Sequence, residues 1–234
     1  MFEFFATLFV YTFQRFGKLK INLAFSGPRL DWMLANLIIV KMLMLFSVCF
    51  AAFFAIAFNW ETLLLLFPFG LIAGLYVGKF PFHFPFNLRD IPFIKAHLIA
   101  LTWSGMSVVI PMAEYGLSYQ PKYFLFFGGI YLFIFSLAIV FDARDVDLDE
   151  PSKRTVPQIV GKKGALILSC GLIGIAFLIF YLVGNYPILP FVSMLTFVEL
   201  FVINSWNKKD DLYYSFYLDG LIVLTGSSLC HWMI

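Results

Sequence analysis

Long apolar runs separated by short polar segments make up most of the chain. Eight runs occur, at about residues 2–16, 34–58, 61–78, 93–113, 123–141, 164–184, 188–206 and 213–232. The runs are continuous rather than alternating, which favours helices over the short period-two strands of a membrane barrel. A transmembrane helix needs about 20 apolar residues, a length that the first run does not reach. The pattern predicts an all-α polytopic membrane helix bundle with about eight transmembrane helices.

The composition agrees with a chain that lies in a bilayer. Of 234 residues, 62% are hydrophobic and 13% are charged, whereas a soluble domain carries roughly 25% charged residues. No Ser-rich or charged linker divides the chain, so we expect one transmembrane domain over residues 1–234. High hydrophobicity and a net charge of +2 argue against disorder and against nucleic acid as a partner.

The basic residues are distributed unevenly between alternate loops. Fourteen of the 16 Lys and Arg residues follow the first, third, fifth and seventh runs, while Lys122 is alone in the opposite loops. Because cytoplasmic loops collect positive charge, these four loops are expected in the cytoplasm and both chain ends outside. The start, MFEFFATLFV, has no basic segment typical of a cleavable signal. We therefore expect an integral protein of a prokaryotic inner membrane.

An acidic segment, FDARDVDLDE, ends the fifth run. It contains Asp142, Asp145, Asp147, Asp149 and Glu150. If the helix continues, Asp142, Asp145 and Asp149 lie at i, i+3 and i+7 and therefore share one face. Carboxylate oxygens suit Mg²⁺, which is often shared with substrate phosphates. The alternative interpretation is a solvated acidic loop that balances the basic residues after it.

Residues 141–161 resemble the second aspartate-rich region of the UbiA-type intramembrane prenyltransferases. They read FDARDVDLDEPSKRTVPQIVG, similar to that family's D-x-x-D-x-x-x-D followed by a basic residue, T-[LIV]-P and Gly. The segment LRDIPFIK, residues 88–95, is similar to the basic loop before the family's fifth helix. The tail YYSFYLDGLIVL, residues 213–224, is similar to its last helix, with Asp219 as the intramembrane acid.

Two features depart from the UbiA-type pattern. The family typically has nine helices, and counting back from Asp142 indicates that the usual first helix is missing. The family's first motif, N-D-x-x-D, is replaced by TLFVYTFQRF, residues 7–16, which contains no acid. Tyr11, Gln14 and Arg15 occupy the expected positions, so the first metal-binding half does not carry over.

The resemblance implies a Mg²⁺-dependent membrane prenyltransferase, which moves a prenyl group from a polyprenyl diphosphate to an aromatic or other lipophilic acceptor. Asp142, Asp145 and Asp149 would hold the metal and carry the catalysis. The implied substrate contacts are Arg89, Lys95, Lys153, Arg154, Tyr11, Gln14, Arg15 and Asp219. The missing first motif keeps open a catalytically silent homologue that binds a prenyl lipid or scaffolds membrane partners. A cation-coupled transporter is less favoured, because its acids would lie at mid-membrane depth.

Overall fold

The structure is a computed structural model that describes residues 1–21, 28–77, 88, 91–147, 151–184, 186–207, 210 and 212–233. The elements within these residues are all helices, as the continuous apolar runs predict. The chain divides into two compact units, which are described separately. The first comprises Met1–Leu88 with Ala113–Gly116, and the second comprises Arg89–Met112 with Leu117–Ile234.

Four helices form the first unit, and α1 packs mainly against α3. Their bounds are α1 Phe2–Ile21, α2 Pro28–Ala35, α3 Leu37–Ala55 and α4 Trp60–Val77. The ring of Phe5 on α1 lies 5.0 Å from that of Phe50 on α3, measured between centroids. Asn59 caps α4, because its side-chain oxygen accepts a 2.8 Å hydrogen bond from the Thr62 N–H. The Asn59 N–H also donates to a Glu114 carboxylate oxygen at 3.1 Å.

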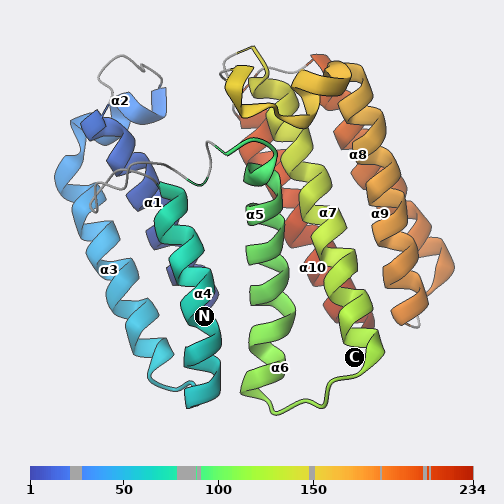
Figure 1. Ribbon diagram of the computed structural model, residues 1–234, viewed down its shortest axis with the longest axis horizontal. Helices are drawn as coiled ribbons and strands as arrows, with labels where there is room; N and C mark the ends of the chain where they lie inside the picture. Colours follow the sequence, from blue (N-terminus) through green and yellow to red (C-terminus); the bar gives the residue numbers. More distant parts are fainter. Residues whose placement is uncertain are drawn as a thin grey trace. The chain divides into compact units, whose positions relative to one another are not determined.

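The second unit contains the longer helices. Its elements are α5 Ile94–Ser104, the π-helical turn η2 Gly105–Val109, α6 Ile110–Glu114 as far as Met112, α7 Pro121–Asp145, the 3₁₀ turn η3 Pro151–Lys153, α8 Val156–Val183, α9 Ile188–Asn204, the 3₁₀ turn η4 Ser205–Asn207, the π-helical turn η5 Tyr213–Leu218 and α10 Asp219–Met233. Figure 1 shows these helices as long rods. α7 packs against both α5 and α8, and α9 packs on α8.

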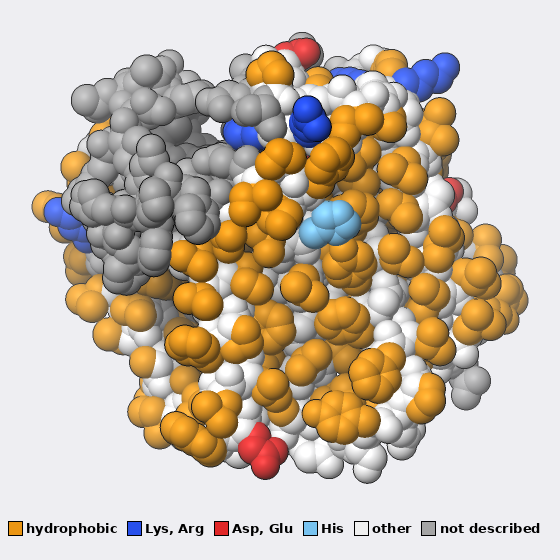
Figure 2. Space-filling model, in the orientation of Figure 1, with side chains coloured by type: hydrophobic (Ala, Val, Ile, Leu, Met, Phe, Trp, Pro, Cys, Tyr) orange, Lys and Arg blue, Asp and Glu red, His pale blue; other side chains and the backbone are white. Residues whose placement is uncertain are grey.

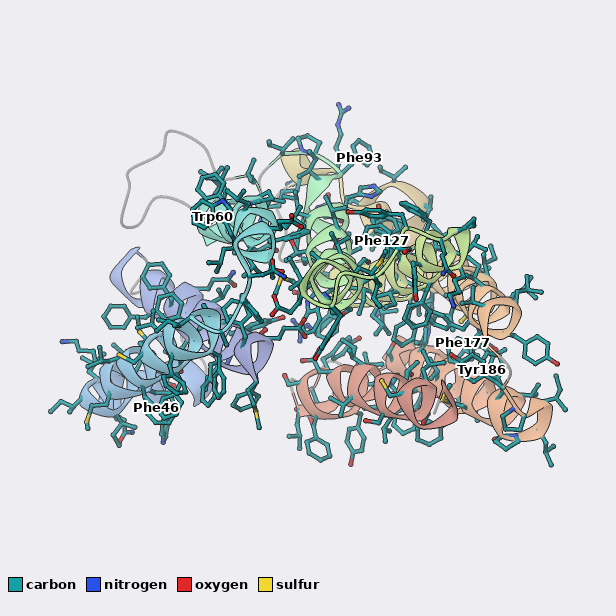
Figure 3. All side chains as sticks on the ribbon, turned by 90° about the horizontal axis from the view of Figure 1, so that it is seen from below. Phe46, Trp60, Phe93, Phe127, Phe177 and Tyr186 are labelled. Carbon is teal, nitrogen blue, oxygen red and sulfur yellow. The ribbon has the colours of Figure 1, made fainter. Side chains whose placement is uncertain are left out.

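Small and polar residues allow α7 and α8 to approach closely. A Cβ added at Gly129 of α7 would lie 2.6 Å from the buried ring of Phe180 on α8. The Ser169 hydroxyl donates to the Ser136 carbonyl at 2.7 Å, which satisfies both groups inside the core. Phe177 and Tyr186, labelled in Figure 3, both pack against Phe191 near the C-terminal end of α8.

α8 contains a break that separates a short surface segment from the apolar helix. Gly161 has φ 74° and ψ 161°, which is not helical. A positive φ strains residues that carry a Cβ, so glycine suits this position. The regular apolar helix therefore begins after Gly161, close to the start of the run expected at 164–184.

Five helical stretches in the described residues are long and apolar enough to cross a membrane. They are Leu37–Ala55, Ile94–Glu114, Pro121–Asp145, Val156–Val183 and Ile188–Asn207. Trp60–Tyr76 is apolar but shorter. Figure 2 shows hydrophobic side chains over most of the visible surface, and many large ones are more than a third exposed. These features fit an integral membrane protein, because apolar surface of this kind is compatible with lipid.

Candidate functional site

The acidic end of α7 begins the candidate site. α7 continues to Asp145, so the condition under which the sequence places Asp142 and Asp145 on one face is met for these two residues. Asp142 is buried, with 3% of its surface exposed, and Asp145 is partly buried. Asp147 follows in an exposed turn. Asp149, the third predicted carboxylate, and Arg89, a predicted phosphate contact, lie outside the described residues.

Lys95 forms an ion pair with Asp142. The Lys95 ammonium on the first turn of α5 donates to Oδ1 of Asp142. The Lys95 side chain is 20% exposed, whereas that of Asp142 is 5% exposed. A buried carboxylate is costly unless it is paired and hydrogen-bonded, so the Lys95 ammonium compensates the burial of Asp142. This ion pair connects two segments that sequence reasoning placed in one site.

Arg144 binds the second carboxylate. Its Nε donates to Oδ1 of Asp145 at 2.6 Å, and its Nη2 donates to Oδ2 at 3.0 Å. The planar guanidinium thus contacts both oxygens of Asp145, a geometry that favours Arg over Lys. The guanidinium carbon also lies 4.7 Å from the centroid of the Tyr214 ring and 5.6 Å from that of Phe141. Arg144 is therefore held by aromatic packing as well as by charge.

Two adjacent tyrosines connect this site to the end of α9. The hydroxyl of Tyr213 donates to the Phe201 carbonyl at 2.5 Å, and that of Tyr214 donates to the Ser205 carbonyl at 3.2 Å. The Phe201 carbonyl also accepts from the Ser205 backbone N–H, so Tyr213 adds a second hydrogen bond to it, and Tyr214 provides a donor for the Ser205 carbonyl at the helix end. Because Tyr214 is 1% exposed, its ring provides a fixed surface for the Arg144 guanidinium.

The segment before α8 lies beside the start of α5. The backbone N–H of Phe93 donates to the Lys153 carbonyl at 3.3 Å, and Figure 3 labels Phe93. Arg154 has a positive φ of 45° and an exposed side chain. In the part of the chain that the structure describes, the Arg154 side chain makes no ion pair. Backbone strain in residues other than glycine is concentrated at functional sites.

The remaining predicted residues belong to other helices. Asp219 begins α10 and is exposed. Tyr11, Gln14 and Arg15 lie on α1, where Tyr11 and Arg15 are exposed and Gln14 is partly buried. The site described above is built from the second unit alone, because α1 belongs to the first unit.

The described carboxylates do not fit Mg²⁺ as they are arranged. The magnesium ion binds carboxylate oxygens, but Arg144 contacts both oxygens of Asp145 and Lys95 contacts Asp142. A divalent ion and an ammonium about 4 Å apart repel by about 8 kcal/mol at an effective dielectric constant of about 20. A metal would therefore compete with these side chains for the same oxygens. Within the described ranges, no three His, Cys, Asp or Glu side chains form a group that could hold a metal.

Sequence reasoning did not identify Arg144 and Tyr214 as parts of the site. The two residues are 70 positions apart, and neither lies in a spacing typical of a ligand site. A Tyr pair at the start of a helix and a basic residue between two acids are the only local signals. The contacts that bring them together arise from packing between helices.

No protein-family model matches the chain, and neither do the curated proteins or the solved structures with which it was compared. Membership of the UbiA superfamily therefore stays a prediction that rests on residues 88–95, 141–161 and 213–224.

Proposed function

We propose that this protein transfers a prenyl group from a polyprenyl diphosphate to a lipophilic acceptor in the membrane. One observation carries the proposal: three segments assigned to the site from sequence lie together in the second unit. Lys95 contacts Asp142, and Phe93 hydrogen-bonds the Lys153 carbonyl. These contacts support one site built from the α5 start, the α7 end and the segment before α8.

Positive side chains at such a site favour departure of a diphosphate. The bond between the allylic carbon and the diphosphate oxygen breaks, and its electron pair remains on the leaving group. The carbocation then alkylates the acceptor, which loses a proton. Lys95, Lys153 and Arg154 supply cations where negative charge increases, and this stabilises the transition state more than the ground state. The resemblance implies Mg²⁺ at Asp142, Asp145 and Asp149, so metal dependence is part of the test.

The proposal includes a membrane arrangement. The eight apolar runs would span the bilayer as a UbiA-like bundle, with the acidic end of α7 in the cytoplasm of a prokaryotic cell. The basic residues that follow alternate runs support this orientation. Labelling of single cysteines from either side of the membrane tests it, with Cys introduced at Arg154 and at Lys122. Reaction of both from the same side would contradict it.

A second candidate is a silent homologue that binds a prenyl lipid without turning it over. The specific observation in its favour is that Asp142 and Asp145 are each already paired with a cation from the same chain. A carboxylate held in an ion pair is less able to hold a catalytic metal.

One assay separates the two candidates. Purified full-length protein in detergent receives radiolabelled farnesyl diphosphate and a panel of aromatic and lipid acceptors, with and without Mg²⁺. Asp145→Asn is the test variant, and Asp31→Asn, which removes an exposed acid from the first unit, is the matched control. Product that is lost only in Asp145→Asn supports prenyl transfer. Diphosphate binding without product supports the silent homologue, and the absence of both binding and product contradicts the site.

A further inference from the structure

We propose that the site at the end of α7 binds its phosphate-bearing ligand without a divalent metal. Lys95 and Arg144 neutralise the negative charge of the carboxylates and of the phosphate, which a metal would otherwise do. The inference rests on the proposed function for the identity of the ligand. It starts from the disagreement between the carboxylates expected to hold Mg²⁺ and the partners that the structure gives them.

Lys95 and Arg144 are both held firmly in the folded site. Arg144 contacts both oxygens of Asp145 and lies over the ring of the buried Tyr214. To reach Asp145, a metal would have to displace a guanidinium that is held by charge and by ring contact together. Lys95 is 20% exposed and holds a carboxylate that is almost fully buried. Both cations are therefore parts of the folded site and not solvated surface groups.

Lys95 and Arg144 each have enough N–H donors to bind a phosphate while they hold a carboxylate. A guanidinium has five N–H donors and an ammonium has three, so each is able to hold a carboxylate and a phosphate oxygen at once. Metal ions in phosphate sites neutralise phosphate charge and connect it to protein carboxylates. Lys95 and Arg144 perform both tasks with covalently attached charges.

Arg154 is a third cation, and its side chain makes no ion pair with a carboxylate among the described residues. Arg154 follows Lys153, whose carbonyl is bonded to the residue before α5, so its backbone is tied to the same region. No described residue pairs with the Arg154 side chain, which is exposed. Its positive φ fixes an unfavourable backbone conformation at this point of the chain. Arg154 is therefore able to contact an incoming anion without first breaking an ion pair.

Binding of radiolabelled farnesyl diphosphate to the full chain in detergent tests the inference, with either EDTA or Mg²⁺ present. We expect Kd values within threefold of each other in the two conditions. Farnesol, which lacks the phosphates, is expected to compete poorly. Direct titration of the protein with Mn²⁺ in the absence of farnesyl diphosphate, followed by the paramagnetic resonance signal of the ion, is expected to show no ion bound at the site.

Variants distinguish internal cations from a metal by whether their effects depend on Mg²⁺. Arg144→Gln and Arg154→Gln should each weaken binding by tenfold or more, whereas Lys122→Gln, at the opposite end of α7, should leave it unchanged. Asp145→Asn should change binding by the same factor in EDTA and in Mg²⁺, because no metal ligand is removed; if Asp145 held a metal, the variant would weaken binding only when Mg²⁺ is present. Arg144→Lys keeps the charge and is expected to retain part of the binding, and circular dichroism of Arg144→Gln checks that this variant is folded.

Binding that falls tenfold or more in EDTA overturns the inference and leaves the diphosphate ligand of the proposed function in place. Stoichiometric Mn²⁺ binding that Asp145→Asn abolishes also overturns it. No binding of farnesyl diphosphate in either condition removes the proposed ligand, and the inference fails with it.

Discussion

The ion pair between Lys95 and Asp142 provides a direct test of the arrangement at the end of α7. Lys95→Met leaves the Asp142 carboxylate without its ammonium, in a position where its side chain is 5% exposed. Removal of one partner of a buried ion pair typically costs about 3–5 kcal/mol, because the remaining charge is buried and uncompensated. Asp142→Leu should cost less, about 1–3 kcal/mol, since the Lys95 side chain is 20% exposed and keeps part of its hydration.

The double variant Lys95→Met/Asp142→Leu removes both charges and fills the space with apolar atoms. Such replacements are often close to neutral, so we expect a free energy of unfolding within about 1 kcal/mol of the unmodified chain. The double-mutant cycle should then give a coupling energy of at least about 2 kcal/mol. Circular dichroism during titration of detergent micelles with a denaturing detergent measures each free energy. Lys122→Met, an exposed change at the other end of α7, is the control.

Two results would refute this reasoning. If the effects of the single variants add up in the double variant, Lys95 and Asp142 do not interact in the folded protein. If Asp142→Leu is more destabilising than Lys95→Met, the carboxylate is not the more deeply buried partner. Either outcome would also weaken the proposal that Lys95 neutralises Asp142 in the ligand site.

Three further changes test the helix packing and the backbone, each measured as a change in unfolding free energy. Gly129→Ala should destabilise by about 1–3 kcal/mol, because its Cβ meets the buried Phe180 ring; Gly128→Ala, with no atom within 4 Å, should not destabilise. Gly161→Ala should cost about 1–2 kcal/mol because its φ is positive, and an unchanged stability would contradict the break in α8. Asn59→Ala should cost about 1 kcal/mol through loss of the α4 cap, and Asn59→Asp, which keeps the capping oxygen, should recover most of it.

The helical elements follow from local sequence, while the contacts of the site do not. Continuous apolar runs predict helices over residues 123–141 and 164–184, and the structure has helices there. α7 extends past the predicted run to Asp145, which the apolar pattern did not predict, because Asp142 and Asp145 are polar. Asp145 is paired with its chain neighbour Arg144, but the partner of Asp142 is set by packing between helices, because Lys95 lies 47 positions away. The resemblance to the UbiA-type family implies that Lys95 contacts a phosphate, and only the packing of α5 on α7 shows that it holds Asp142.

The absence of acids from residues 7–16 and the pairing of Asp142 and Asp145 with cations point in the same direction. In UbiA-type enzymes two acidic motifs are expected to hold metal, but here residues 7–16 contain no acid and include Arg15. In the second unit, Asp142 forms an ion pair with a lysine and Asp145 forms one with an arginine. A carboxylate neutralised in this way attracts a divalent ion weakly, whereas the same ammonium and guanidinium groups still attract a phosphate. If a chain keeps the geometry of a phosphate site while losing free carboxylates, its affinity for the anion has to come from its own side chains. Metal-independent binding is therefore the property that best separates this site from the one implied by the resemblance.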